Sequence, residues 1–326
     1  MKVIALGEVM MRLSQPENVE LNRANNLSIY FGGGEYNTLV NLAGLGHQTE
    51  IVTSLPNNQL TTRIFAEAKT YGVGTKFTNI TEGRLGTYYA ILGDNVTPTQ
   101  VIYDRADSCF ANSSTNDYNF DSIFAGADLF HVSGITAALN EQTKELTLEA
   151  IKYAKSKGIA ISYDSNYRAK LWTQAEAGEF MRQVLPLIDY AFLGLLDIKY
   201  LLNIDTNILQ DGYELLKKEY PNIKLFASTN REVVSPTIHK LKVNIYDTNL
   251  YTTDEITMDV KDRIGGGDVF TGGVLDGILL GKDKEEIAKF ALADAAIKHQ
   301  RYGDNCFITR QEVEAVSSGS SLAISR

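Results

Sequence analysis

The chain has 326 residues, with 31 lysines and arginines against 40 aspartates and glutamates, and its formal net charge is -9. This acidic balance excludes a protein that coats nucleic acid or an anionic membrane, so we expect neither as a partner. Hydrophobic residues make up 44% and charged residues 22%, which is typical of a folded globular protein. The two cysteines, Cys109 and Cys306, lack metal-ligand spacing and indicate a reducing compartment, so we expect the protein in the cytoplasm.

Short apolar runs alternate with amphipathic segments from the N-terminus onward. The apolar runs span residues 3–6, 51–53, 129–132 and 159–163, and the amphipathic segments span residues 37–45, 61–71, 141–157 and 173–187. This alternation is typical of βαβ units, in which helices cover both faces of a parallel sheet. We therefore predict one α/β domain over residues 1–326, a three-layer α/β/α sandwich with a central, mostly parallel sheet.

Two segments, residues 13–31 and about 83–106, interrupt this alternation. Residues 87–92 and 101–103 are rich in aromatic and β-branched side chains and predict antiparallel strands around a turn at residues 93–95. Strands inserted into an α/β body predict a small β-sheet lid. The edges of such a sheet commonly pair with another copy, which leaves a homo-oligomer joined through the lid as an open alternative.

Several well-known catalytic motifs are missing from the sequence. It contains no G-x-x-x-x-G-K-[ST], no G-x-G-x-x-G after the first strand, no H-E-x-x-H and no G-x-S-x-G. These absences disfavour P-loop nucleotidases, NAD-type dehydrogenases, zincins and α/β-hydrolases.

The clearest local motif is D-R-I-G-G-G-D at residues 262–268, followed by an apolar segment that predicts a helix. Gly265, Gly266 and Gly267 would leave backbone N–H groups free to bind an anion at the helix N-terminus. Beside such a cradle, Asp268 could accept the proton of an attacking hydroxyl, as a base does in phosphoryl transfer. Taken alone, the motif is also compatible with a structural glycine-rich turn.

A second glycine-rich segment, F-G-G-G-E-Y-N at residues 31–37, opens a helix that ends in N-L-A-G-L-G at residues 41–46. In this order, the two segments resemble the paired signatures of the ribokinase / phosphofructokinase B family of sugar kinases. The resemblance covers essentially the whole chain. It implies a ribokinase-like fold, ATP as the phosphate donor and Mg²⁺ as the metal.

Within that family, the chain is most similar to the kinases of keto-deoxy sugar acids. Arg12 stands where many neutral-sugar kinases have an aspartate that accepts sugar hydroxyls, although it could also pair locally. The segments Y-D-R at residues 103–105 and D-S-N-Y-R at residues 164–168 are similar to the sugar-acid subgroup. This likeness implies that Arg105 and Arg168 meet the substrate, and arginine suits a carboxylate because its planar fork can form a bidentate pair.

The resemblance also implies the remaining site residues. The substrate-binding residues would be Gly33, Gly34, Asn37, Tyr89, Tyr103, Arg105, Arg168 and Asp304. The nucleotide-binding residues would be Asn166, Ser228, Thr229, Arg231, Gly265, Gly266 and Gly267.

Two further segments bear on how ATP and magnesium would be bound. Residues 228–233 follow a predicted strand at residues 224–227, where the family binds nucleotide, so the resemblance implies that they form the ATP loop. G-L-L-D at residues 194–197 replaces the N-x-x-E that the wider family uses near magnesium. Asp197 would keep the acidic role as a metal ligand, and how the metal is held stays open.

The resemblance therefore implies ATP-dependent phosphorylation of 2-dehydro-3-deoxy-D-gluconate at its terminal hydroxyl, with Asp268 as the base. The product would be 2-dehydro-3-deoxy-6-phosphogluconate. One alternative is a kinase of the same fold that acts on 5-dehydro-2-deoxygluconate, fructose or a nucleoside. Another is a non-catalytic sugar-acid sensor, which only Gly194 supports.

Overall fold

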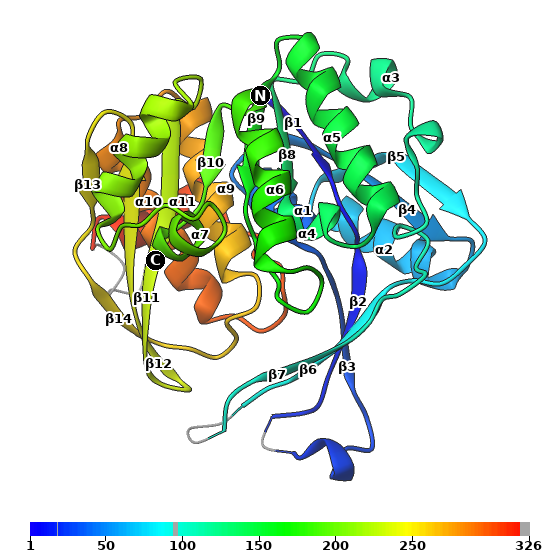
Figure 1. Cartoon of the computed structure of the whole chain (residues 1–326). Coiled ribbons are helices and arrows are strands. Elements are labelled where there is room, and N and C mark those ends of the chain that lie inside the picture. Colours follow the sequence, from blue (N-terminus) through cyan, green and yellow to red (C-terminus); the bar gives the residue numbers. More distant parts are fainter. Residues whose placement is uncertain (18, 94–96, 320–326) are drawn as a thin grey trace.

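The structure is a computed structural model that describes residues 1–17, 19–93 and 97–319. In this part of the chain, ten strands form one sheet in the order β13-β12-β11-β10-β9-β8-β1-β4-β5, with β14 also paired to β12 (Figure 1). The pairs along the path β11-β10-β9-β8-β1-β4-β5 are parallel, whereas β12 pairs antiparallel with β11, β13 and β14. The strands are β1 (Lys2–Leu6), β4 (Gln48–Pro56), β5 (Val73–Thr81), β8 (Leu129–Ser133), β9 (Ala160–Asp164), β10 (Tyr190–Phe192), β11 (Leu225–Ser235), β12 (Ile238–Tyr246), β13 (Leu250–Thr252) and β14 (Ile256–Asp259).

Helices cover both faces of this sheet (Figure 1). Within the described residues they are α1 (Gly34–Gly44), α2 (Gln59–Thr70), α3 (Phe120–Phe124), α4 (Gly134–Ala137), α5 (Glu141–Ser156), α6 (Gln174–Val184), α7 (Leu195–Tyr200), α8 (Leu209–Glu219), α9 (Gly266–Leu279), α10 (Lys284–His299) and α11 (Arg310–Ser317), with the 3-10 turns η1 (Leu21–Arg23), η2 (Thr115–Asp117) and η3 (Leu185–Leu187).

Strand β1 shows how the two layers arise. Its side chains alternate between the faces of the sheet, so that Ile4 joins a core with α5 and α6, while Val3 and Ala5 join a second core with α1, α9 and α10. A strand buried on both faces needs apolar residues at successive positions, as V-I-A-L at residues 3–6 provides. This arrangement confirms the predicted α/β fold with a mostly parallel central sheet.

Local sequence sets the helix boundaries. Helix α6 begins with a capping box, in which the Thr173 hydroxyl accepts from Glu176 N and the Glu176 carboxylate accepts from Thr173 N. The sequence predicted this helix to residue 187, but α6 ends at Val184 and continues as a 3-10 turn. Pro186 has no N–H to donate to the preceding turn, which accounts for the earlier end.

A smaller sheet forms the lid. It has the order β3-β2-β6-β7 and consists of β2 (Met10–Ser14), β3 (Ser28–Gly32), β6 (Thr87–Ile91) and β7 (Gln100–Asp104). The hairpin of β6 and β7 is antiparallel as predicted, whereas β2 and β6 are parallel. Figure 1 shows this sheet extending away from the body. Of the predicted turn at residues 93–95, residues 94 and 95 lie outside the described residues.

No helix in the described part of the chain has the length and apolar character that crossing a membrane requires.

Candidate active site

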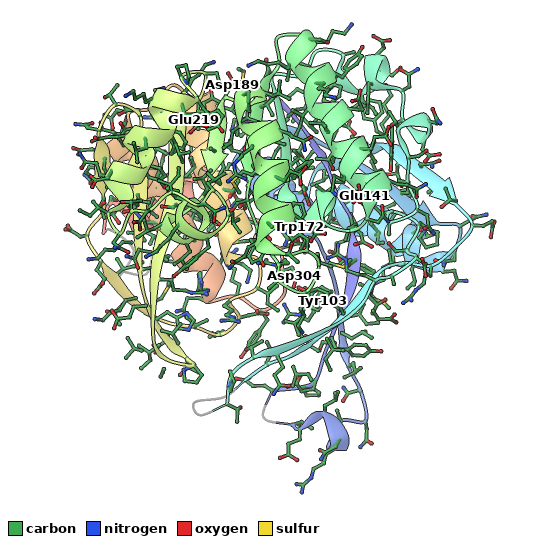
Figure 2. All side chains as sticks on the ribbon, viewed as in Figure 1. Tyr103, Glu141, Trp172, Asp189, Glu219 and Asp304 are labelled. Atoms are coloured by element: carbon green, nitrogen blue, oxygen red, sulfur yellow. The ribbon has the colours of Figure 1, made fainter. Side chains whose placement is uncertain are left out.

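A cavity of about 510 Å³ lies between the body and the lid, at the carboxyl ends of β8 and β9. Ligands bind at this end of the strands in open α/β sheets. Figure 2 shows Tyr103 of the lid and Asp304 of the body near this junction. The lining residues are Met10, Gly33, Gly34, Asn37, Tyr88, Val101, Tyr103, Ile135, Asp164, Asn166, Arg168, Arg231, Arg263, Ile264, Gly265, Gly267, Asp268 and Asp304.

The predicted glycine-rich loop runs directly into α9. Gly265 caps this helix with φ of 85°, and a Cβ there would lie 2.0 Å from the Asp304 carbonyl oxygen, so only glycine fits. A Cβ at Gly267 would meet open space, and Gly267 lines the cavity. Gly266 instead packs against the His299 ring and does not line the cavity. The unpaired N–H groups and the dipole of α9 make its N-terminus attractive to an anion.

Asp268 lies in the first turn of α9 and lines the cavity. Asn37 Nδ2 donates to Asp268 Oδ2 at 2.6 Å, and Asn37 Oδ1 accepts from Gly33 N at 3.2 Å. Desolvation raises the pKa of Asp268 to about 6, while the Asn37 hydrogen bond and the Arg168 charge act in the opposite direction. The carboxyl is thus mostly ionised at neutral pH and more basic than an ordinary aspartate.

The segment after β9 contributes a charged group on the open side of the cavity. Arg168 is exposed, lines the cavity and forms no ion pair with the described residues; Nη1 only donates to Tyr167 O at 3.4 Å. Asn166 also lines the cavity, with a φ of 38° that is uncommon for a residue with a side chain. Desolvation, followed by the charge of Asp268, raises the pKa of Asp164 to about 8.

The sequence predicted a loop at residues 228–233, and this prediction of secondary structure is wrong. Residues 228–233 continue β11, which pairs with β12 as far as Ser235, so the strand does not end at residue 227. Ser228 is buried, and its hydroxyl bonds with Tyr213 and Asn244. Thr229 is exposed, and neither it nor Ser228 lines the cavity.

Arg231 does line the cavity, farther along the same strand, together with Arg263 of the glycine-rich loop. Desolvation lowers the pKa of Arg231, and the charge of Arg263 lowers it further. Both side chains are exposed, and neither forms an ion pair with a described residue. Two like charges therefore face the cavity, and no carboxylate of the described residues forms an ion pair with either.

Arg105 has a different environment from the one expected. It is 8% exposed, and its Nε donates to Glu8 Oε2 at 2.8 Å while Nη2 contacts the same oxygen. Ser108 Oγ donates to the other Glu8 oxygen at 2.5 Å. Nη1 of Arg105 is buried without a hydrogen-bond partner in the described chain. Arg105 does not line the cavity, and its guanidinium is paired with the buried Glu8 carboxylate.

The lid presents Tyr88 and Tyr103 to the cavity, and their rings lie 5.9 Å apart. Tyr89 is not a lining residue, because neighbouring residues of a strand face opposite sides. The cross-strand partner of Tyr103 is Tyr88. On strand β6 the tyrosine that faces the cavity is therefore Tyr88, one residue before the predicted Tyr89.

Arg12 is paired locally, the second of the two roles that the sequence allowed. It is fully buried, and Nη1 and Nη2 bind Asp304 and Asp262, each at 2.6 Å. Asp304 also accepts a hydrogen bond from the Tyr88 hydroxyl. Asp304 lines the cavity, where the predicted substrate-binding role would place it, whereas Arg12 does not line it.

Asp197 is engaged in the fold instead of lining the cavity. Its Oδ2 accepts from Gly194 N at 2.7 Å and caps α7, and Ser165 adds a side-chain hydrogen bond. Burial raises the pKa of Asp197. Among residues 1–17, 19–93 and 97–319, no group of three or more His, Cys, Asp or Glu side chains is arranged to hold a metal ion.

Sequence reasoning missed several lining residues, notably Tyr88, Asp164 and Arg263. Asp164 and Arg263 stand inside motifs that had already been singled out, so their place in those motifs was an available signal. The apolar lining residues Met10, Val101 and Ile135 carry no such signal, because an apolar residue near a strand end is usually core.

The family model of the pfkB carbohydrate kinases matches residues 1–309 of this sequence. The chain belongs to the pfkB family of carbohydrate kinases. It is therefore a sugar kinase, and the family implies ATP as the phosphate donor.

Three relatives of this kinase cover most of its length. A 2-dehydro-3-deoxygalactonokinase of Haloferax volcanii is 31% identical over 325 residues, which is 100% of this chain and 99% of the relative. A 2-dehydro-3-deoxygluconokinase of Bacillus subtilis is 27% identical over 92% of this chain and 90% of the relative. The crystal structure of a 2-dehydro-3-deoxygluconokinase from Thermotoga maritima is 32% identical, with a TM-score of 0.95 over 98% of each chain.

Proposed function

We propose that this kinase transfers the γ-phosphoryl group of ATP to the terminal hydroxyl of a 2-dehydro-3-deoxy sugar acid. The observation that carries the proposal is the arrangement of one cavity, where Asp268 lies beside the glycine-rich loop and Arg168 forms no ion pair with a carboxylate of the described residues. A base, an anion cradle and a free guanidinium are the groups that phosphorylation of a sugar acid needs.

The chemistry follows from Asp268 and the start of α9. Asp268 takes the proton of the substrate hydroxyl, whose oxygen then forms a bond to the γ-phosphorus as the bond to the bridging oxygen of ADP breaks. The N–H groups at the N-terminus of α9 stabilise the charge on the transferred group. Asn37 holds the Asp268 carboxylate at 2.6 Å and thereby fixes its orientation.

Arg168 is the residue that distinguishes an acid from a neutral sugar. Its exposed guanidinium can form a bidentate pair with the substrate carboxylate. Asp304 and Tyr103, which line the same cavity, can bond to the sugar hydroxyls. Movement of the lid toward the body would exclude water and protect ATP from hydrolysis.

Mg²⁺ fits Asp164 better than Asp197. Asp164 lines the cavity and uses Oδ1 to accept from Asn166 N at 3.0 Å, whereas Asp197 is committed to the start of α7. Magnesium in kinases is usually held by one or two carboxylates together with the phosphates of the nucleotide. When bound, it neutralises phosphate charge. Asp164→Asn should therefore raise the Mg²⁺ concentration needed for half-maximal rate, whereas Asp197→Asn should leave it unchanged.

The substrate configuration leaves two candidates. We propose 2-dehydro-3-deoxygluconate, and the relative from Haloferax volcanii supports its C4 epimer, 2-dehydro-3-deoxygalactonate, as the second candidate. The two acids share the carboxylate and the terminal hydroxyl, so Arg168 and Asp268 treat them alike. Groups that meet the C4 hydroxyl must decide between them.

A coupled assay of ADP release tests the proposal. The panel contains both epimers, 5-dehydro-2-deoxygluconate, fructose and a nucleoside, at equal concentrations with Mg²⁺ and ATP. We expect the highest kcat/KM for one of the two 3-deoxy acids. Equal turnover of fructose would overturn the sugar-acid assignment, and sugar-acid binding without any ADP release would identify a sensor.

The lid is also where we propose that two copies meet. Its outer strands, β3 and β7, have edges that pair with no further strand among the described residues, and Ile29 and Ile102 on them are exposed. Ile102→Lys should reduce the molar mass in light scattering from that of a dimer to that of a monomer. A monomeric parent would contradict this assembly.

A further inference from the structure

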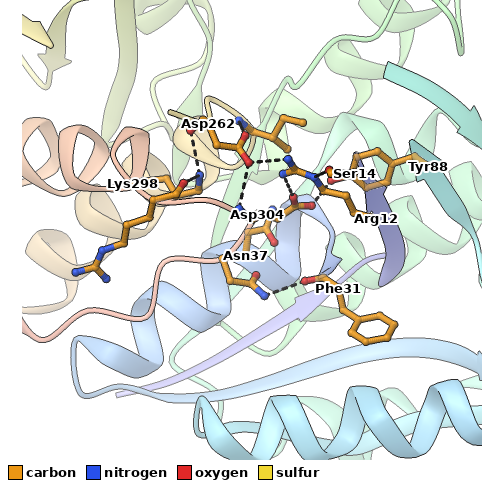
Figure 3. A network of polar contacts seen from close by, with 12 residues as sticks. Arg12, Ser14, Phe31, Asn37, Tyr88, Asp262, Lys298 and Asp304 are labelled. Atoms are coloured by element: carbon orange, nitrogen blue, oxygen red, sulfur yellow. Dashed lines mark hydrogen bonds and ion pairs between the residues drawn. The ribbon is translucent and has the colours of Figure 1, made fainter. Parts of the chain in front are cut away.

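Four charged side chains are buried together beneath the glycine-rich loop (Figure 3). Arg12 and Lys298 are 0% exposed, and Asp262 and Asp304 are each 2% exposed. The two cations and two carboxylates balance in charge. Arg12 binds both carboxylates at 2.6 Å, so neither acid is left uncompensated.

The cluster joins three separate parts of the chain. Arg12 belongs to strand β2 of the lid, Asp262 starts the glycine-rich loop, and Lys298 and Asp304 lie at the end of α10 and in the loop after it. Lys298 Nζ donates to the backbone oxygens of Asp262 and Arg301, each at 3.2 Å. Because the Lys298 ammonium binds both carbonyl oxygens, it holds the glycine-rich loop and the loop after α10 at a fixed separation.

The contacts reach the anion-binding backbone directly. Asp262 Oδ1 accepts from Ile264 N at 3.0 Å, and Oδ2 accepts from Gly303 N at 3.1 Å. The Cβ position of Gly265 lies 3.2 Å from Lys298 Cε and 2.0 Å from the Asp304 backbone oxygen. The backbone that begins α9 therefore rests on the cluster, and a shift of either loop would move the N–H groups that face the cavity.

We propose that Lys298 and Arg12 are positioning residues that hold the glycine-rich loop against the loop of Asp304, and thereby fix the geometry of the phosphate-binding backbone. The inference rests on the proposed phosphoryl transfer. It differs from a purely stabilising role, in which loss of one buried charge lowers stability and kcat falls only with the folded fraction. A positioning role predicts lost catalysis in a protein that is still folded.

Lys298→Met tests this directly, because it keeps the aliphatic stem and removes the ammonium. Removal of one buried cation should lower the midpoint of thermal unfolding, so the kinetics are measured well below that midpoint, where the variant is folded. There we expect kcat to fall about 10- to 100-fold and the dissociation constant for ADP to rise, as when a catalytic group is displaced by about 1 Å. The matched control is Lys289→Met on the same helix, because the side chain of Lys289 is 56% exposed. It should keep the kcat and ADP affinity of the parent.

Chemical rescue separates positioning from general damage. The variant leaves two carbonyl oxygens without their cation, so ammonium or potassium chloride should restore part of kcat to Lys298→Met and none to Lys289→Met. Tetramethylammonium chloride at the same ionic strength is too large and has no N–H, so it should not rescue.

A second variant covers the case in which Lys298→Met does not fold. Arg12→Lys keeps the charge but loses the fork that binds both acids, and it should lower kcat more than it changes KM for the sugar acid. Parent-like kcat and ADP affinity in folded Lys298→Met would overturn the inference, as would a loss of kcat that merely follows the unfolded fraction. A parent that phosphorylates no sugar acid would instead refute the proposed function.

Discussion

The arginines around the cavity fall into two groups. Arg12 and Arg105 are buried and bound to carboxylates of the protein, whereas Arg168, Arg231 and Arg263 line the cavity without an ion pair among the described residues. A guanidinium satisfied by an internal carboxylate holds elements together, and one left unpaired is available to an anion. All five stand in or next to motifs, so motif membership alone does not separate the two roles.

The largest effect on the cavity side should come from Asp268, which lies in the first turn of α9 and lines the cavity. Asp268→Asn removes the base and keeps the side-chain shape, so kcat should fall by about 10² to 10⁴. The affinity for ATP should stay close to that of the parent, as measured by calorimetry. Near-parental turnover would show that another group accepts the proton.

On the buried side, Arg105→Gln should cost stability. It leaves the Glu8 carboxylate, which is 4% exposed, without its cation, and breaking a buried pair from one side costs about 3–5 kcal/mol. Denaturant unfolding measures this loss. The control is Arg84→Gln, because the pair of Arg84 with Asp104 has side chains that are 42% and 55% exposed, and an ion pair so exposed to solvent contributes little to stability. Equal losses of unfolding free energy in Arg105→Gln and Arg84→Gln would contradict a structural role for the buried arginines.

The smallest effect is that of pH on the parent. Because desolvation raises the pKa of Asp268 to about 6, the base is ionised above that pH and protonated below it. We expect kcat/KM to be level above about pH 7 and to fall about tenfold per unit below the pKa. A rate that stays constant down to pH 4.5 would contradict a base with this pKa.

The sequence predicted the sheet, the helices and the glycine-rich loop, because their signals are local. A one-residue error at Tyr89 shows where this fails. A tight turn centred on residue 94 would place Tyr89 on the same face as Tyr103, but Ile91 pairs with Gln100, and this register places Tyr88 there. Periodicity gives two faces of a strand, and only the pairing decides which one meets the cavity.

The sequence alone also could not predict which charged residues form ion pairs with one another. Glu8 and Arg105 are 97 residues apart, and Arg12 and Asp304 are 292 residues apart. Only the fold brings such partners together, so Arg105 could not be distinguished from Arg168 beforehand. The extension of β11 past residue 227 has the same origin, because polar residues such as Thr229 form a strand there through pairing with β12.

The measurement that tests the central claim most directly is the ratio of kcat/KM for 2-dehydro-3-deoxygluconate to that for fructose in Arg168→Gln, with Arg84→Gln as the control. If the unpaired guanidinium binds the carboxylate, its loss removes about 1.5–3 kcal/mol from the acid alone. The ratio should then fall about 10- to 150-fold in Arg168→Gln and stay at the parental value in Arg84→Gln. An unchanged ratio in Arg168→Gln would contradict the account.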